Sequence, residues 1–193
     1  SNIPEDTVAK DSKNQAVTYA IGENNYRFSV FGESREPAND VEKYLTDFLA
    51  DKINKYIEIG AFVGNGSHQI VSKVQRPVLA TGTGYKSMDM QGSRFIQLDM
   101  TSKSLRTSAS GQWKWLINQL DSFTGKNVFL FLENAPESFS DRLESKLLKD
   151  ILAEYASTKF GNVWVFYKGD KNMVTKDRSV RYFSTCGFDV DNL

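Results

Sequence analysis

Few side chains in this chain suit acid–base, nucleophilic or transition-metal chemistry. The 193 residues include one histidine, His68, and one cysteine, Cys186. A single residue of each type excludes most sites that bind a metal through several histidines or cysteines. Cys186 has no histidine near it in sequence, so we expect a small buried side chain rather than a nucleophile. His68 follows a turn at residues 64–67, and we expect a surface or helix-entry residue; a functional histidine with a perturbed pKa is the alternative.

Carboxylates form the second set of candidates. Four acidic residues stand at or just after apolar runs: Glu33, Asp99, Glu133 and Asp170. Hard oxygen ligands of this kind suit Mg²⁺ or Ca²⁺, so one carboxylate-bound metal is one hypothesis. The other hypothesis is charge compensation, in which Arg35 and Lys171 pair with these carboxylates and Asp99 caps the end of its strand.

A glycine-rich string, Thr-Gly-Thr-Gly at residues 81–84, has the composition of some phosphate-binding loops. It lacks the Gly-x-x-x-x-Gly-Lys spacing, and no clear helix start follows it. We therefore expect a connecting loop without a phosphate-binding role.

Composition limits the broad class of protein. Lys plus Arg number 24 and Asp plus Glu number 24, so the formal net charge is zero. A nucleic-acid partner is not expected, because such binding depends on an excess of basic residues that neutralise phosphates. No apolar run approaches the ~20 residues of a bilayer-spanning helix, so membrane insertion is not expected.

Hydrophobic patterning divides the chain into elements. Residues 1–16 are polar and lack periodicity, which predicts a linker or disordered arm, and residues 17–193 are expected to form a single domain. Apolar and β-branched runs predict strands at residues 17–21, 26–31, 56–60, 77–81, 94–100, 128–132, 163–167 and 179–185. Spacings of three and four predict helices near residues 39–55, 108–123 and 141–157, with Asn39 and Ser140 as the expected N-caps of the first and last. The glycine-rich residues 82–92 and the polar residues 169–178 are expected to connect strands. The alternation indicates an α/β fold.

Six groups of residues follow one another along this pattern. They are YRFSVFGESREP, YIEIGAFVGNGSH, RPVLATGTGYKS, GSRFIQLDMT with SGQWKWLINQL, NVFLFLENAP, and VWVFYKGDKN with VRYFSTCG. Together, over roughly residues 25–187, they resemble the calcineurin-like metallophosphoesterase superfamily. The resemblance implies a four-layer αββα sandwich, in which two mixed β-sheets pack face to face between helices. It also implies a site in the loops at the carboxyl ends of the strands.

In that family, two metal ions are held by an Asp-x-His pair, a Gly-Asp step, an Asn-His pair, a lone His and a Gly-His-x-His signature. Two metals need a shared carboxylate, imidazoles and an Asn carbonyl to activate water and clamp a phosphate. The matching positions of this chain carry other residues: Glu33 and Arg35 for the first pair, Ala61 for the shared carboxylate, Thr83 and Gly84 for the Asn-His pair, Glu133 for the lone histidine, and Asp170 and Asn172 for the last signature. The resemblance therefore implies a degenerate site.

These observations predict a pseudoenzyme: a catalytically inactive metallophosphoesterase-like domain that acts as a binding or structural module of a larger, exported bacterial protein. A single cysteine suits either a reducing cytosol or bacterial extracellular proteins that avoid cysteine. The polar residues 1–16 and the resemblance to exported multidomain proteins favour an extracellular or cell-envelope location. We expect no cofactor, and we expect other domains of the same chain or a cell-surface protein as partners. The alternatives are a residual phosphoesterase or hydrolase that uses a single carboxylate-bound metal, and a domain that completes or regulates an active partner enzyme.

Overall fold

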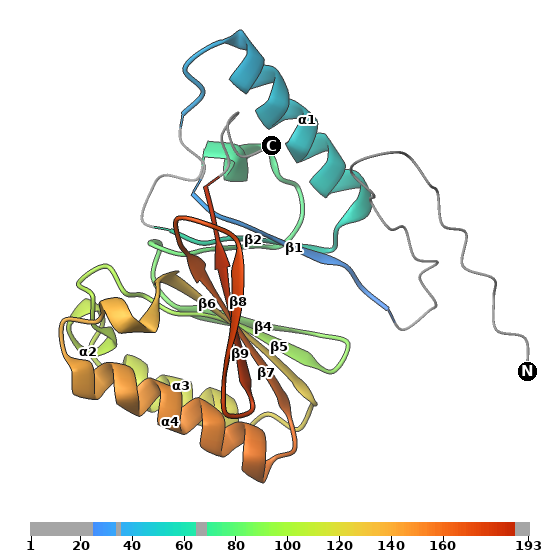
Figure 1. Cartoon of the computed structure of the whole chain (residues 1–193). Helices are drawn as coiled ribbons and strands as arrows, with labels where there is room; N and C mark the ends of the chain where they lie inside the picture. Colours follow the sequence, from blue (N-terminus) through green and yellow to red (C-terminus); the bar gives the residue numbers. More distant parts are fainter. Residues whose placement is uncertain (1–24, 34–35, 65–68, 188–193) are drawn as a thin grey trace, which may run out of the picture.

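The chain folds as an α/β sandwich of four layers (Figure 1). A computed structural model describes residues 25–33, 36–64 and 69–187. Helix α1 covers the outer face of a three-stranded sheet, and helices α3 and α4 cover the outer face of a six-stranded sheet. The inner faces of the two sheets pack against each other. The predicted αββα sandwich is confirmed. The predicted linker at residues 1–16 and the predicted strand at 17–21 lie outside the described residues.

The small sheet has the order β1-β2-β3, with strands β1 (Phe28–Phe31), β2 (Ile59–Phe62) and β3 (Val78–Ala80). Both pairings are parallel, so among the described strands only the large sheet is mixed. Parallel neighbours need crossover connections. Helix α1 (Asp40–Tyr56) makes the first, and the 3₁₀ helix η1 (Gln69–Lys73) lies in the second.

Helix α1 forms as its sequence predicts. The side chain of Asn39 accepts a hydrogen bond from the backbone of Glu42 at 3.0 Å, which satisfies one of the free amides of the first turn. Ala50 and Ile53 are buried against Phe62 of the small sheet. This packing fixes α1 over one face of that sheet.

The large sheet has the order β4-β5-β6-β7-β9-β8. Its strands are β4 (Lys86–Met90), β5 (Ser93–Gln97), β6 (Asn127–Asn134), β7 (Asn162–Lys168), β8 (Met173–Asp177) and β9 (Val180–Thr185). The four central strands are parallel, and the two edge strands are antiparallel to their neighbours. Strand β6 is central, as the apolar run at 128–132 predicts.

Two strands were missed in the sequence. Strand β4 lies within residues 82–92 and strand β8 within residues 169–178, both of which were expected only to connect other strands. Both are edge strands that expose polar side chains, and four of the five residues of β8 are exposed. Edge strands carry polar residues because they are covered on fewer sides, so they lack the apolar run that marks a central strand.

The remaining helices differ at their ends from the expected ranges. The predicted helix at 108–123 is α2 (Leu105–Ser108) followed by α3 (Gln112–Asp121), which are separated near Gly111, a residue with φ of 85°. Helix α4 (Arg142–Thr158) is capped by Asp141, whose carboxylate accepts a hydrogen bond from the amide of Leu143 at 2.8 Å. Ser140, the expected cap, lies one residue before it, and its amide donates to Lys103 O. A short 3₁₀ helix, η2 (Pro136–Ser138), precedes α4.

Aromatic side chains fill the space between the sheets. In register on β5, β6 and β7, Phe95 stacks on Phe129 with ring centroids 4.9 Å apart, and Phe129 stacks on Trp164 at 4.7 Å. Such pairs of neighbouring strands stabilise a sheet beyond the burial of their area. None of the helices in the described part of the chain is long and apolar enough to cross a membrane.

Candidate functional site

The described residues that were matched to the family's site lie at or near the carboxyl ends of the strands, but their burial and their contacts differ. Strand β6 ends beside Glu133, which is 0% exposed. Its Oε1 accepts a hydrogen bond from Thr101 Oγ1 at 3.3 Å, and the nearby backbone of Met100 and Gly82 favours its ionised form. Its Oε2 is buried without a partner among the described residues. Burial raises the pKa of Glu133, and the nearby charge of Asp99 adds to the rise.

Asp99 caps the turn after β5, as the charge-compensation hypothesis expected. Its Oδ1 accepts from the amide of Thr101 at 3.0 Å and from the Thr101 hydroxyl at 2.8 Å. The backbone of Asp99 is held by Gln112, which is 0% exposed and exchanges two hydrogen bonds with it, at 2.7 and 3.0 Å. Thr101 thus bridges Asp99 and Glu133, the only two of the four candidate carboxylates that the described contacts bring together.

Glu33 follows β1 and forms an ion pair with Lys168, the last residue of β7. Gly64 lies against this pair: a Cβ on Gly64 would come within 3.0 Å of the Glu33 Cβ and 3.3 Å of the Lys168 Cδ. The ammonium group therefore stands where the ends of β1, β2 and β7 meet. The charge-compensation hypothesis named Arg35 and Lys171 as partners of the four carboxylates; at Glu33, Lys168 forms an ion pair. Arg35 lies outside the described residues.

Lys168 lies at the candidate site and was not among the residues expected from the sequence. It directly follows the apolar run 163–167, so its place at the carboxyl end of a central strand was visible in the pattern. The resemblance to the family instead predicted site residues at 169–172.

Ala61 does not lie in a loop. It stands inside β2, paired with Val30 and Leu79, and it is 0% exposed between the two sheets. The strand continues past the expected end at residue 60, because Val63 N still donates to Phe31 O at 2.8 Å. Val63 and Gly64 follow the end of this strand.

The Thr-Gly-Thr-Gly loop at 81–84 is fixed by hydrogen bonds within the protein. Thr81 is 0% exposed, and its hydroxyl accepts from Gly64 N and donates to Gly64 O, both at 2.8 Å. Thr83 Oγ1 donates to Ala80 O at 2.6 Å and accepts from Gln97 Nε2 at 3.2 Å. The carbonyl oxygen of Gly84 accepts a hydrogen bond from Gln97 Nε2 at 2.5 Å. The hydroxyl groups of Thr81 and Thr83 thus form hydrogen bonds within the protein, as expected for a loop that connects strands.

The last matched loop, between β7 and β8, is exposed. Asn172 Oδ1 accepts from Cys186 N at 3.1 Å and Cys186 Sγ at 3.4 Å, which ties the loop to the end of β9. Lys171 O accepts from Ser184 Oγ at 2.8 Å. Asp170 and Lys171 are exposed, and neither forms an ion pair with another described residue. Cys186 is partly buried, in partial agreement with the expectation, and His68 lies outside the described residues.

These residues do not fit a pair of metal ions. Within residues 25–33, 36–64 and 69–187, no group of three or more His, Cys, Asp or Glu side chains is placed to hold a metal. Glu33 is paired with a lysine, Ala61 has no ligand atom, and Thr83 is committed to the loop. The single-metal hypothesis would need Glu33, Asp99, Glu133 and Asp170 together, and the described contacts join two of them.

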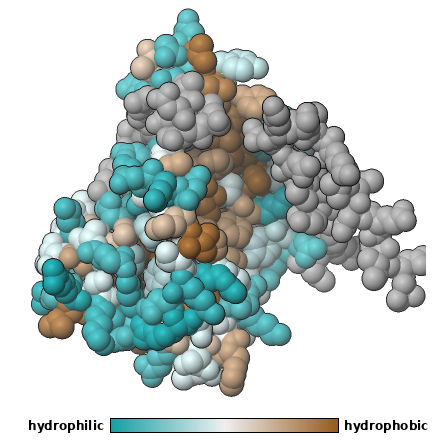
Figure 2. Space-filling view, viewed as in Figure 1, coloured by the Kyte–Doolittle hydropathy of each residue, from teal (hydrophilic) through white to brown (hydrophobic). Residues whose placement is uncertain are grey.

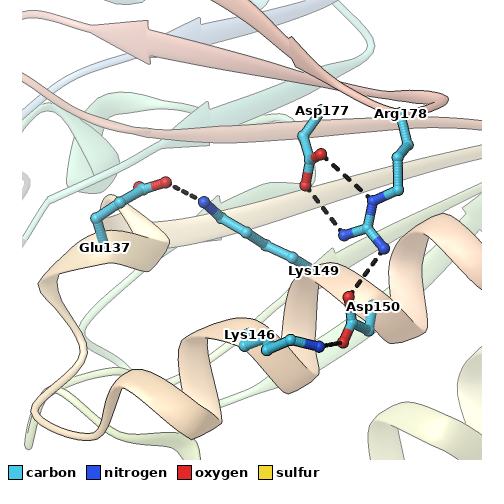
Figure 3. A network of polar contacts seen from close by, with 6 residues as sticks. All are labelled: Glu137, Lys146, Lys149, Asp150, Asp177 and Arg178. Atoms are coloured by element: carbon cyan, nitrogen blue, oxygen red, sulfur yellow. Dashed lines mark hydrogen bonds and ion pairs between the residues drawn. The ribbon is translucent and has the colours of Figure 1, made fainter.

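A second polar cluster lies on the helix side of the large sheet. Arg178, in the turn between β8 and β9, pairs with Asp177 and with Asp150 of α4, and Asp150 also pairs with Lys146 (Figure 3). Lys149 of the same helix pairs with Glu137. Hydrogen bonds from Lys146 and Arg178 lower the pKa of Asp150. The Arg178–Asp150 pair connects α4 to the β8–β9 hairpin, so we assign this cluster a structural role.

No protein-family model and no curated protein sequence matches the chain. Among solved structures, the fold is similar to "GAP50 the anchor in the inner membrane complex of Plasmodium", with a TM-score of 0.54 and 12% sequence identity. The match covers 84% of this chain and 71% of that chain. At this identity the likeness concerns the fold alone.

Proposed function

We propose that this chain is a metallophosphoesterase-like domain that has lost its metal ligands and acts as a non-catalytic binding or structural module of a larger protein. The observation that carries the proposal is the ion pair between Glu33 and Lys168 at the strand ends. The pair engages the Glu33 carboxylate, which the resemblance matches to a metal-ligand position, with an ammonium group.

The chemistry of the other strand ends supports the same conclusion. Hydrolysis of a phosphoester by two metals needs an activated water and cations that neutralise the developing charge. A lysine ammonium repels a divalent ion at that edge. The raised pKa of Glu133 weakens it as a metal ligand, because a ligating carboxylate must give up its proton.

The expected setting is a larger, exported bacterial protein, in which other domains of the chain or a cell-surface protein bind this module. The similar solved structure is described as an anchor in a complex, which gives a precedent for such a fold in a structural role. The single cysteine suits an extracellular or cell-envelope location. Completion or regulation of a partner enzyme is a variant of the same proposal, since it too requires no chemistry from this chain.

A residual hydrolase with a single carboxylate-bound metal is the second candidate. The observation in its favour is that Asp99 and Glu133 both contact the hydroxyl of Thr101, so two carboxylates lie close together.

Metal binding and turnover separate the two candidates. The protein is incubated with Mn²⁺ or Zn²⁺, desalted and analysed for bound metal, and then assayed on an aryl phosphate monoester and an aryl phosphate diester with Mn²⁺ present. We expect less than one tightly bound ion per chain and hydrolysis equal to that of buffer with Mn²⁺. The comparison variants are Glu33→Ala/Glu133→Ala at the site and Glu137→Ala/Asp177→Ala at the exposed cluster. Metal-dependent turnover that the first variant abolishes and the second retains would establish the residual hydrolase.

A further inference from the structure

Helix α1 exposes large apolar side chains on the side that faces away from the small sheet. Ala50 and Ile53, on its inner side, are buried against that sheet. On its outer side Val41 is 60% exposed, Tyr44 67% and Phe48 49%. Apolar side chains reach the surface at the α1 end of the molecule in the space-filling view, among hydrophilic neighbours (Figure 2). Exposed apolar side chains that gather in one patch mark an interaction surface.

Contacts along the helix hold the outer side chains in place. The rings of Tyr44 and Phe48 stack with their centroids 6.4 Å apart. The Lys52 ammonium group lies over the Phe48 ring, 4.9 Å from its centroid, and over the Tyr56 ring at 5.6 Å. Lys55 lies over the same Tyr56 ring at 5.2 Å. Side chains that are ordered before a partner binds lose less entropy on binding.

The spacing of the outer side chains is symmetric. The α1 stripe consists of Val41, Tyr44, Phe48, Lys52 and Lys55, at intervals of three, four, four and three residues, so Phe48 is its centre. Such intervals place all five on one face of a helix. At a rise of about 1.5 Å per residue, Tyr44 and Lys52 lie about 6 Å from Phe48 along the axis, and the two outermost residues about 10.5 Å. Two antiparallel copies centred on Phe48 would therefore match position for position.

We propose that two copies of this chain form a symmetric dimer in which their α1 helices pack antiparallel through the α1 stripe, about a two-fold axis at Phe48. In such a contact each residue pair occurs twice. The two Phe48 rings meet at the axis. On either side, Tyr44 of one copy meets Lys52 of the partner subunit, and Val41 meets the stem of the partner subunit's Lys55. The Tyr44 ring then receives a cation, and the exposed apolar surface of Val41 and Phe48 is buried.

The charges of α1 favour a second copy in this orientation. Asp40 lies in the first turn of the helix and Lys55 in the last. Neither forms an ion pair with another residue of the described part of the chain. The antiparallel arrangement places Asp40 of each copy beside Lys55 of the partner subunit and opposes the two helix dipoles, whereas a parallel arrangement would bring like helix ends together. The helix thus carries the charges that a second copy needs.

The size of the contact predicts a weak dimer. A helix of 17 residues is about 25 Å long. Two helices of this length bury less than the roughly 1,600 Å² of a standard interface. We therefore expect a dissociation constant of about 10–100 µM. The dimer does not rest on the loss of catalysis proposed above, because no residue of the α1 stripe belongs to the candidate site.

Sedimentation equilibrium of the full chain, from about 5 to 500 µM, tests the association. In the unchanged protein, the average mass should rise from that of a monomer toward that of a dimer. Phe48→Asp places two carboxylates at the axis and should raise the dissociation constant at least about 10-fold. Leu147→Asp is the matched control, since Leu147 is 48% exposed on α4, and this variant should dimerise as the unchanged protein does. Circular dichroism checks that both variants are folded.

Charge reversal tests the orientation of the helices. Asp40→Lys and Lys55→Asp each place like charges side by side in the antiparallel dimer, so each should raise the dissociation constant about 3- to 10-fold at low salt. The double variant restores opposite charges and should return the dissociation constant to within about 2-fold of the original.

Three outcomes overturn the proposal. The first is a monomer at every concentration, which would leave the α1 stripe to a partner of another sequence. The second is a dimer that Phe48→Asp and Leu147→Asp weaken equally, or that neither weakens. The third is the absence of a loss in the single charge variants or of a recovery in the double variant, because the helices would then not be antiparallel about Phe48.

Discussion

Glu133 and Glu144 are two buried glutamates in different layers of the molecule, and their surroundings shift their pKa values in opposite directions. Glu133 is 0% exposed at the end of β6, with Asp99 beside it, and its pKa is raised above 4.5. Glu144 is 7% exposed on α4, and its Oε1 accepts from Trp113 Nε1 at 2.8 Å and Arg106 N at 3.0 Å. Burial raises the pKa of Glu144, but the polar groups of Ser104, Trp113 and the Arg106 backbone outweigh burial and lower it.

The comparison distinguishes a buried carboxylate whose ionised form is stabilised by hydrogen bonds, Glu144, from one whose neutral form is favoured, Glu133. In both residues Oε2 is buried without a hydrogen-bond partner of good geometry among the described residues. The difference therefore lies in the deeper burial of Glu133 and in the hydrogen-bond donors around the rest of each carboxylate. Glu144 accepts from the first turn of α2 and from Trp113 of α3, so its ionised form is favoured. Burial removes Glu133 from water, and Asp99 lies beside it, so its neutral form is favoured.

Loss of the Glu144 carboxylate has the largest expected effect. Glu144→Ala leaves the Trp113 indole and the Arg106 amide without their acceptor, so we expect a loss of about 2–3 kcal/mol in the free energy of unfolding. Urea unfolding at pH 7 measures it. Glu154→Ala, an exposed residue of the same helix, is the control and should change stability by less than about 0.5 kcal/mol. Equal losses in the two variants would show that the Glu144 hydrogen bonds do not stabilise the fold.

The acid limb of the stability curve tests the lowered pKa of Glu144. A carboxyl whose pKa is lower in the folded than in the unfolded state contributes stability above the unfolded value, near 4.5, and loses it as the pH falls through the folded value. We expect Glu144→Gln to flatten the decline of stability below about pH 4.5. An unchanged slope in that range would contradict the lowered pKa.

Glu133→Gln should have a smaller effect of opposite sign. A carboxyl with a raised folded pKa costs stability as the pH rises from 4.5 through that pKa, because the folded state must ionise a buried group. The amide keeps an acceptor for Thr101 and removes the charge next to Asp99. We expect a gain of about 1 kcal/mol at pH 7, which disappears at pH 4. A loss at pH 7 would mean that the charge of Glu133 is used by the fold or by a bound ligand.

Lys168→Met should have a weaker effect again. The Lys168 and Glu33 side chains are 38% and 28% exposed, so solvent screens their attraction. We expect a loss of about 0.5 kcal/mol that shrinks in 0.5 M NaCl, measured by urea unfolding. Lys171→Met, an exposed residue without an ion pair among the described residues, is the matched control. A loss independent of salt would indicate that packing against Gly64, rather than charge, is the main contribution.

The smallest effect is expected at the exposed cluster of Figure 3. Asp150→Asn removes the partner of Lys146 and Arg178, but all three groups are exposed to solvent. We expect a change in the thermal midpoint that is smaller than that of Lys168→Met and is abolished by salt. A larger shift than at Lys168 would reverse the ranking of the two polar regions.

Much of the fold could be predicted from hydrophobic periodicity. The amphipathic stripe and the Asn39 cap define α1, and the continuous apolar runs at 128–132 and 163–167 define the two central strands. These signals are local, because the residues that carry them are close in sequence and are buried on one or both faces. Strands β4 and β8 could not be predicted in this way. Each of them is a strand because it forms backbone hydrogen bonds with one neighbouring strand, β5 for β4 and β9 for β8. The local sequence pattern does not show this pairing.

The features of the candidate site can also be separated into those that the sequence determined and those that depend on tertiary contacts. The sequence alone determined that the chain has one histidine and that the matched positions carry Glu33, Thr83 and Glu133 instead of the family's ligands. Only the tertiary structure decided that Lys168 is the partner of Glu33, that Ala61 lies in the core and that Glu133 lies beside Asp99. The reason is physical: composition limits which ligands exist, whereas the pKa and the pairing of a charge depend on neighbours that the sheet brings together from distant strands.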